Sequence, residues 1–222
     1  MRVALTFDAE HPDRAHRPGV QEEMLQVLRE REVRATFFLQ GRWVEAFPET
    51  ARRVVADGHL VGSHSFYHAR LPLLSDEGLV VDIQEAERAI RAIAGVDPRP
   101  WFRCPFFAGE DDPRVIRTLN GLGYTIVPVD VVLDDWDPGR RAEQIVADAV
   151  LGCATAGDGA IVLLHTWPPQ ALEALPAMID ALRAAGVAFV DVSQLPAERW
   201  AIDPGLSAPG IARGAAVRGV GG

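Results

Sequence analysis

The segment Arg2-Val3-Ala4-Leu5-Thr6-Phe7-Asp8 opens the chain with a short apolar run that ends on a carboxylate. Such a run is typical of a strand in a buried sheet. Similar runs recur along the chain, and stretches of helical periodicity separate them. We expect strands near 2–7, 34–40, 60–64, 100–105, 124–130, 159–165 and 187–192. We expect helices near 19–32, 43–57, 75–94, 112–122, 140–156 and 170–185.

This alternation of strands and helices predicts an α/β fold with a mostly parallel sheet covered by helices. A barrel and an open, doubly wound sheet both fit the pattern. A G-x-G-x-x-G segment does not follow the first strand, which disfavours a dinucleotide-binding fold. The pattern predicts one domain over residues 1–200. The Gly-, Ala- and Pro-rich segment 201–222 predicts a flexible C-terminal tail.

The composition excludes several classes of function. Arginine supplies all 22 basic residues of the 222-residue chain, and the formal net charge is −9. Without lysine there is no Schiff-base lysine, no Walker-type phosphate loop and no lysine-bound pyridoxal. An acidic chain without basic runs disfavours nucleic acid and anionic membranes as partners. The first residues lack the features of a signal peptide, so we expect a cytoplasmic protein if Met1 is the native start.

Polar residues collect where the expected strands end. They are Asp8 and Glu10 after the first strand, His64 and His68 after the third, Arg103 at the end of the fourth, Asp130, Asp134 and Asp135 after the fifth, and His165 at the end of the sixth. Because the carboxyl ends of parallel strands open on one face, these residues are expected to converge there. Together they indicate a hydrolytic metal site.

The spacing of the histidines and carboxylates suits that chemistry. His64 and His68 are four residues apart, which would place both imidazoles on one side of a helical turn, and two imidazoles with a carboxylate form a common Zn²⁺ site. Asp8 and Glu10 lie two residues apart in an extended chain and therefore point the same way. One of them could bind metal while the other takes a proton from water. The alternatives are a pair of histidines at the surface or satisfied in the core, and carboxylates that only cap a helix or lie solvated in a loop.

Arg103 and His165 complete the candidate site. Arg103 lies in an apolar run, and if it is buried it needs a carboxylate partner, for which Asp8 is the candidate; an arginine that points to solvent is the alternative. His165 ends a strand, which suits a general acid whose ring is held by a carboxylate such as Asp135. The other histidines, His11, His16 and His59, are interpreted as ordinary loop residues.

Five ordered segments resemble the NodB-homology polysaccharide deacetylases, carbohydrate esterase family four. They are Thr6-Phe7-Asp8, His64-Ser65-Phe66-Tyr67-His68, Arg103-Cys104-Pro105-Phe106, Asp135-Trp136 and Leu163-Leu164-His165. Arg34-Ala35-Thr36-Phe37-Phe38-Leu39 also resembles that family's second strand, and the likeness covers about residues 2–196. The resemblance implies a distorted (β/α) barrel, usually of seven strands, and metal-assisted removal of N-acetyl groups from amino sugars.

The resemblance also implies roles for individual residues. Asp8 would be the general base and Arg103 its brace, His165 the general acid oriented by Asp135, and His64 and His68 ligands of a divalent metal, Zn²⁺ or else Co²⁺ or Ni²⁺. Leu163 and Trp136 would line the pocket for the acetyl methyl group, unless they only pack in the core. A backbone N–H near Phe106 would hold the oxyanion.

The chain departs from the family pattern at three positions. Ala9 stands where the family commonly has a second, metal-binding aspartate, and we expect Glu10 to take that role. Phe107 replaces a frequent glycine, and Thr166 replaces an aspartate after the last histidine. A bulky Phe107 would narrow the cleft, and with no export signal this favours a small soluble N-acetylated sugar or related intermediate over a wall polymer.

Three functions follow as hypotheses. The first is a metal-dependent deacetylase. The absent aspartate at Ala9 motivates the second, a metal-independent hydrolase of a cyclic amide or ureide on the same fold. The third is a carbohydrate-binding protein without catalysis. The sequence leaves open the sugar, the acyl group, the metal, the pathway and the oligomeric state.

Overall fold

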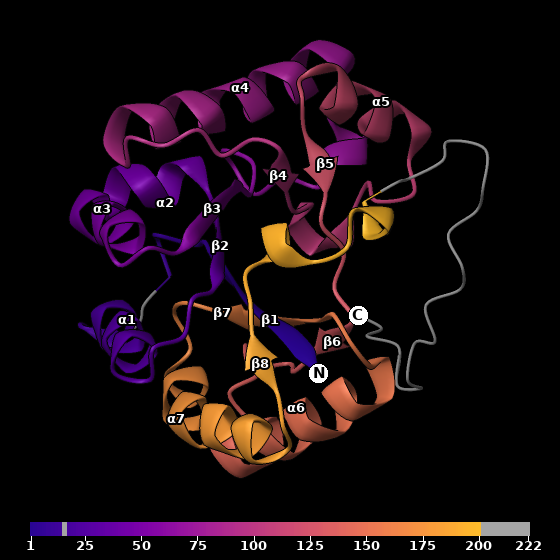
Figure 1. Cartoon of the computed structure of the whole chain (residues 1–222). Helices are drawn as coiled ribbons and strands as arrows, with labels where there is room; N and C mark the ends of the chain where they lie inside the picture. The colour runs from indigo at the N-terminus through magenta and orange to yellow at the C-terminus, as the bar shows by residue number, and fades with distance from the viewer. Residues whose placement is uncertain (15–16, 201–222) are drawn as a thin grey trace.

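A parallel sheet that curls into an incomplete barrel forms the centre of the computed structural model, which describes residues 1–14 and 17–200 (Figure 1). The strands are β1 (Arg2–Ala9), β2 (Thr36–Leu39), β3 (Leu60–Ser63), β4 (Trp101–Phe102), β5 (Thr125–Ile126), β6 (Val131–Val132), β7 (Ala160–His165) and β8 (Ala188–Phe189). The α-helices are α1 (Val20–Glu30), α2 (Gly41–Ala46), α3 (Pro48–Ala56), α4 (Asp76–Ile93), α5 (Pro113–Gly121), α6 (Ala142–Ala156) and α7 (Pro169–Ala184).

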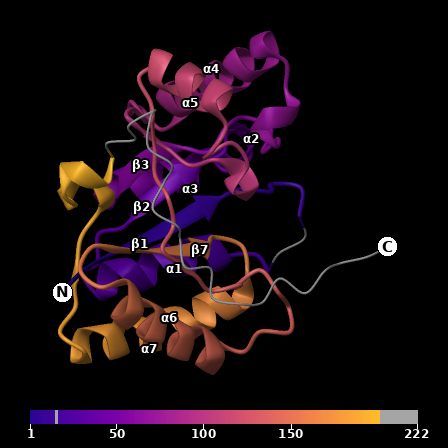
Figure 2. The same cartoon turned by 90° about the vertical axis from the view of Figure 1, so that its right-hand side faces the viewer.

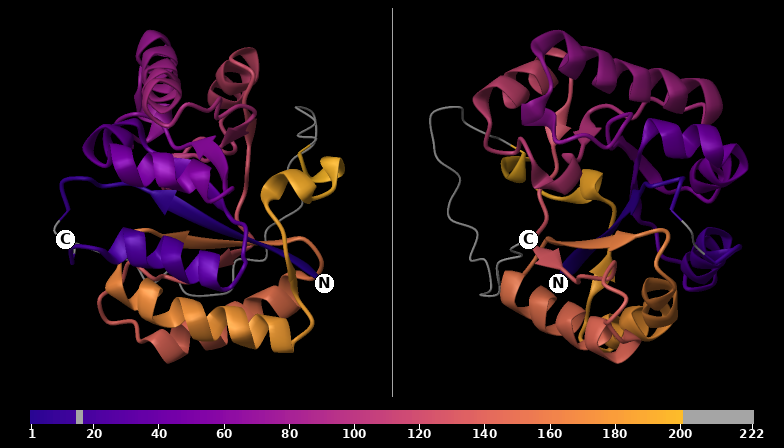
Figure 3. Two further views of the ribbon diagram at one scale, coloured as in Figure 1. Left: turned by 60° about the vertical axis from the view of Figure 1, so that its left-hand side comes forward. Right: turned by 180° about the vertical axis from the view of Figure 1, so that it is seen from behind.

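Seven strands form one row in the order β5-β4-β3-β2-β1-β7-β6, and all the pairs are parallel. The short β8 pairs with Arg2 and Val3 of β1, while β2 pairs with the other half of that strand, Thr6 to Ala9. Helices α4 and α5 lie at one side of the molecule, outside the curled sheet, and α6 and α7 lie side by side at the opposite side of the molecule (Figures 2 and 3). The expected α/β fold with a barrel-like parallel sheet is confirmed.

The side chains of β1 alternate between two buried environments. Val3, Leu5 and Phe7 pack into the large core between the strands and the helices. Ala4 faces the inside of the curled sheet and packs there in a second apolar cluster. Because side chains of a strand alternate with a period of two, Thr6 and Asp8 point to the same inner side as Ala4.

The inner side is filled tightly enough to require a glycine. A Cβ atom on Gly62 of β3 would lie 2.7 Å from the ring of Phe38 and 2.9 Å from the carbonyl oxygen of Trp101. The guanidinium carbon of Arg103 lies 4.2 Å from the centre of the same Phe38 ring. The inner side of the sheet is therefore a packed interior.

Several elements differ from the sequence-based expectation. The helix expected over 43–57 is two helices, α2 and α3, because Pro48 takes the first position of a new helix. The strand expected over 124–130 is only the two-residue β5, and the further two-residue β6 follows it. The expected tail over 201–222 lies outside the described residues. No helix in the described part of the chain is long and apolar enough to cross a membrane.

Candidate active site and metal centre

Asp8 and Arg103 form a buried ion pair on the inner side of the sheet. Arg103 is fully buried, and its Nη1 donates to Asp8 Oδ1 at 3.1 Å and to Thr6 Oγ1 at 2.7 Å. Thr6 in turn donates its hydroxyl proton to the carbonyl oxygen of Val162 at 2.7 Å. The carboxylate that Arg103 was expected to need is therefore Asp8, and its second oxygen, Oδ2, is left to face the histidines.

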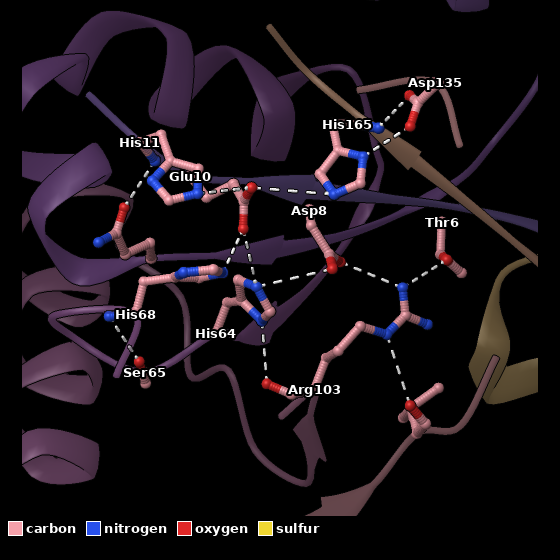
Figure 4. Close-up of polar contacts among 12 residues, drawn as sticks. Thr6, Asp8, Glu10, His11, His64, Ser65, His68, Arg103, Asp135 and His165 are labelled. Carbon is pink, nitrogen blue, oxygen red and sulfur yellow. Dashed lines mark hydrogen bonds and ion pairs between the residues drawn. The ribbon is translucent and has the colours of Figure 1, made fainter. Parts of the chain in front are cut away.

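Glu10 lies at the centre of the histidine cluster (Figure 4). Its Oε2 is 3.3 Å from His64 Nε2 and also contacts His68 Nε2. His64 Nε2 lies 3.6 Å from Asp8 Oδ2 as well. All four side chains are buried. The structure thus brings together the two carboxylates and the two histidines that were expected to converge.

The His64 ring is held in the orientation that a metal ligand needs. Its Nδ1 lies 2.9 Å from the carbonyl oxygen of Arg103. A carbonyl oxygen can only accept, so Nδ1 carries the proton and Nε2 of the neutral ring keeps a free lone pair. This arrangement, in which the far ring nitrogen donates to a fixed oxygen, is common for metal-binding histidines.

The segment from His64 to His68 is not the helical turn expected from its spacing. Ser65 and His68 have φ values of 61° and 58°, in the left-handed region. The buried carboxylate of Asp82, on α4, accepts hydrogen bonds from the backbone N–H groups of Phe66 and Tyr67 at 3.1 and 3.0 Å. These bonds fold the loop so that the two imidazole rings lie 4.9 Å apart.

Asp82 is a functional-site residue that the sequence analysis missed. The helical periodicity of this region identifies an apolar face that includes Leu79, Ile83 and Ala86, and Asp82 lies on that same face. A carboxylate on an apolar face needs a polar partner, which is the signal that could have identified it.

His11 is the second residue that the sequence analysis missed. It was interpreted as an ordinary loop residue, but its Nε2 lies 3.1 Å from Glu10 Oε1. Ligand atoms of Glu10, His11 and His68 all lie within 4.8 Å of one another. The only signal for His11 in the sequence was its position directly after Glu10. The turn that directs its ring toward Glu10 has no recognisable sequence pattern.

Burial and charge set the ionisation of the cluster. Burial favours the neutral form of Glu10, but the interactions of its carboxylate with His11, His64 and His68 outweigh this effect and hold the pKa of Glu10 well below its ordinary value. Burial lowers the pKa of the His68 imidazole. Glu10 is therefore an anion and His68 a neutral base at neutral pH, as metal ligands must be.

His165 and Asp135 form the second half of the site. His165 Nδ1 donates to Asp135 Oδ1 at 2.7 Å, and the His165 backbone N–H donates to Asp135 Oδ2 at 2.7 Å. His165 Nε2 points toward Glu10 Oε1, 3.8 Å away (Figure 4). Burial lowers the pKa of His165, but the charge and hydrogen bond of Asp135, with the charges of Glu10 and Asp8, raise it to about 9.

The residues expected to bind substrate lie at different depths. Leu163 is buried on β7, two residues before His165 and so on the same face. Trp136 is partly exposed, and its ring meets that of His165 edge-on at 5.4 Å. Phe106 is half exposed, and its ring meets that of His68 at 4.4 Å.

Two of the acidic residues expected near this site lie outside it. Asp130 accepts from the backbone N–H of Ile161 at 2.9 Å and pairs with Arg199 at 2.5 Å. Ile161 lies near the start of β7, far along the strand from His165. Asp134 is exposed in the turn that precedes Asp135. Neither carboxylate belongs to the cluster around Glu10.

The donors of this cluster fit a divalent metal ion. Glu10 supplies an anionic oxygen, and His64 and His68 direct ring nitrogens to that oxygen. Nitrogen and oxygen donors in this combination suit Zn²⁺, Co²⁺ and Ni²⁺. Asp8 is held by Arg103 next to this cluster.

Comparison with known proteins identifies the family. The model of the polysaccharide deacetylase family matches residues 1–127, which is more than half of the chain. The chain belongs to the polysaccharide deacetylase family. All five segments that resemble this family in sequence contribute a residue to the site described above or to its rim.

Two curated members of this family are similar along most of the chain. The chitin deacetylase of Colletotrichum lindemuthianum is 34% identical over 182 residues, which cover 78% of this chain and 72% of the relative. The chitooligosaccharide deacetylase of Azorhizobium caulinodans is 30% identical over 201 residues, covering 84% and 90%. Other relatives are longer: the chain spans about half, 52%, of the uncharacterized protein YlxY of Bacillus subtilis.

One of the similar solved structures belongs to a pseudoenzyme. The wild-type protein BA3943 of Bacillus anthracis, described as a pseudoenzyme of carbohydrate esterase family 4, is 26% identical with a TM-score of 0.77. The match covers 87% of this chain and 64% of that one. A mutant of BA3943, described as having restored enzymatic activity, is 28% identical with a TM-score of 0.76 over 87% of this chain and 66% of that one. The fold of a polysaccharide deacetylase therefore does not by itself establish catalysis.

Proposed function

We propose that this polysaccharide deacetylase is a metal-dependent hydrolase that removes the N-acetyl group from an amino sugar. The observation that carries the proposal is the position of Asp8 and His165 next to the cluster of Glu10, His64 and His68. Asp8 and His165 are register partners on the adjacent strands β1 and β7. A base and an acid thus lie beside one site that can hold a divalent ion.

The residues divide the chemistry of amide hydrolysis among them. A divalent ion held by Glu10, His64 and His68 would supply Lewis-acid polarisation of the amide carbonyl and of the attacking water. Asp8 takes one proton from that water while the oxygen of the water bonds to the carbonyl carbon. Arg103 keeps the Asp8 carboxylate in place and compensates its negative charge.

His165 completes the reaction at the leaving nitrogen. With a pKa of about 9, its imidazole is protonated at neutral pH. The proton on Nε2 passes to the amide nitrogen as the bond between carbon and nitrogen breaks, and acetate and a free amine result. Asp135 holds the ring through Nδ1 so that Nε2 faces the site.

The rim of the site favours a small substrate over a polymer. Phe106 and Phe107 are both partly exposed, and Phe106 stands directly beside His68. The Phe106 ring therefore narrows the approach to the cluster, and we expect Phe107, the next residue, to narrow it further. The relatives named above are a chitin deacetylase and a chitooligosaccharide deacetylase, whose named substrates differ in chain length. The length of the substrate is therefore the property to vary in the experiment.

Acetate release from a graded set of substrates tests this function. The set contains N-acetylglucosamine, short chitooligosaccharides and colloidal chitin, each with the Zn²⁺-loaded protein and with its Asp8→Asn variant. We expect the wild type to release acetate, fastest from the short substrates, and Asp8→Asn to lose at least about 100-fold in rate. Equal rates for the two proteins would contradict the role of Asp8, and faster release from chitin would contradict the small substrate.

A sugar-binding protein without catalysis is the second candidate, which the similarity to the pseudoenzyme BA3943 favours. The presence of Asp8, Arg103, Asp135 and His165 in a connected arrangement argues for catalysis instead. Calorimetry with the same oligosaccharides separates the two. Binding that is unchanged in Asp8→Asn, together with no acetate from the wild type, would establish the second candidate.

A further inference from the structure

His11 contacts the candidate metal centre but has no part in the reaction steps above. Its Nε2 lies 3.1 Å from Glu10 Oε1, the oxygen that does not face His64 and His68. Its ring also meets the His68 ring edge-on, with 4.6 Å between the centres. Ligand atoms of His11, Glu10 and His68 thus form a compact set, and His68 also lies beside His64.

The local backbone holds His11 in this position. Its φ value of 54° lies in the left-handed region, which residues other than glycine rarely adopt. Its backbone N–H donates to Gln40 Oε1 at 3.0 Å, and Gln40 is buried directly after β2. The turn therefore returns the imidazole to the site, and such conformations at non-glycine residues concentrate at functional sites.

We propose that His11 is a further protein ligand of the metal ion, binding through Nε2 together with Glu10, His64 and His68. The inference rests on the metal binding in the proposed function. Each of the three imidazoles contributes a nitrogen donor that contacts the same carboxylate. A third imidazole makes the set richer in nitrogen, which favours Zn²⁺, Co²⁺ and Ni²⁺ over Mg²⁺ and Mn²⁺.

The competing role for His11 is a hydrogen bond that only orients Glu10. Two variants separate this role from direct coordination. His11→Ala removes both the donor and the ligand. His11→Gln keeps an amide N–H near the position of Nε2, so it can still donate to Glu10, but it lacks the imidazole lone pair. Asp13→Ala is the matched control, because Asp13 is an exposed residue of the same loop that pairs with Arg42.

The first readout is Zn²⁺ affinity, measured by competition with a chromophoric chelator. We expect His11→Ala and His11→Gln to bind at least about 10-fold more weakly than the wild type, and Asp13→Ala to match the wild type. The second readout is the number of coordinated imidazoles, counted from hyperfine-shifted proton signals of the Co²⁺-loaded protein. We expect three imidazoles in the wild type and two in His11→Gln.

The result that overturns the proposal is an unchanged imidazole count in His11→Gln, or wild-type affinity in that variant. His64→Ala separates this failure from that of the proposed function. If His64→Ala loses metal and His11→Gln does not, only the role of His11 is wrong. If the wild type binds neither Zn²⁺ nor Co²⁺, both the metal-dependent function and the role of His11 are wrong.

Discussion

At the scale of one residue, Arg103 connects the packed interior of the curled sheet to the candidate site. Its guanidinium is fully buried, stacks on the Phe38 ring and donates to Asp8 and Thr6. Nη2 has no hydrogen-bond partner among the described residues. A buried ion pair costs desolvation energy and adds little net stability. We infer from the place of Arg103 beside Asp8, the proposed base, that this ion pair serves the chemistry of the site.

Removing this cation should destabilise the fold. Arg103→Met leaves the Asp8 carboxylate buried without its partner, at a cost of about 3–5 kcal/mol in the free energy of unfolding. The double variant with Asp8→Asn should recover part of this loss, because no buried charge then remains uncompensated. Urea unfolding of the two variants checks both statements. A loss below about 1 kcal/mol in Arg103→Met would show that Asp8 is not held by this ion pair.

The His165–Asp135 pair predicts the pH dependence of the reaction. Because the general acid must be protonated, kcat/KM should fall as pH rises through the His165 pKa of about 9. Asp135→Asn removes the main influence that raises this pKa and should move the fall toward the ordinary histidine value of about 6.5. A pH–rate profile of both proteins measures the shift, and coincident alkaline limbs would contradict the assignment of His165.

The same pair makes stability depend on pH, with a defined sign. The pKa of His165 in the folded protein is raised, so protonation stabilises the fold. This contribution is complete below about pH 6.5 and is lost as pH rises through about 9. Urea unfolding of the metal-free protein across that window should show the loss in the wild type and a smaller one in Asp135→Asn.

At the scale of elements, the loop from His64 to His68 depends on helix α4. Asp82 accepts from two backbone N–H groups of that loop, and Ser65 Oγ accepts from the His68 N–H at 3.0 Å. The loop has two left-handed residues and would not hold this shape alone. The helix therefore helps to position both imidazoles through Asp82.

Asp82→Ala should weaken the fold and the metal site together. Loss of two hydrogen bonds to a carboxylate is expected to cost about 2–4 kcal/mol in stability. Metal affinity should fall about 10- to 100-fold, as when the partner of a ligand is removed. Gln84→Ala, on the exposed face of the same helix, is the control and should change stability by less than about 0.5 kcal/mol. Wild-type metal affinity in Asp82→Ala would contradict this role.

The sequence predicts some elements well and others poorly, for physical reasons. β1 and β7 are buried on both faces, so each forms an apolar run that periodicity detects. The two-residue strands β5 and β6 are defined by pairing with distant neighbours and leave no pattern of their own. Pro48 did carry a signal, since proline favours the first turn of a helix over its interior.

The candidate site likewise has parts that the sequence predicts and parts that it does not. Strand ends predicted the contacts of Asp8 with Arg103 and of His165 with Asp135, because parallel strands bring their carboxyl ends to one face. The loop conformation at His64–His68 and the return of His11 depend on left-handed residues and on side chains of other elements. Spacing along the chain does not contain that information.

At the scale of the whole molecule, β1 organises the fold and the site together. It pairs with β2, β7 and β8 (Figure 1). Its inner residues Thr6 and Asp8, and Glu10 directly after the strand, all lie in or beside the site (Figure 4). Site residues that are far apart in the sequence, such as Asp8 and His165, thus meet at one end of the sheet. A cytoplasmic location stays a prediction from the sequence.

The dependence of acetate release on bound metal tests the central claim most directly. The chelated protein is titrated with Zn²⁺, Co²⁺ or Ni²⁺ while metal content and acetate release from a short chitooligosaccharide are measured. We predict no release from the metal-free protein, and a rise that reaches its plateau at about one ion per chain. Full activity after complete chelation would contradict the account and would favour a metal-independent hydrolase on the same fold.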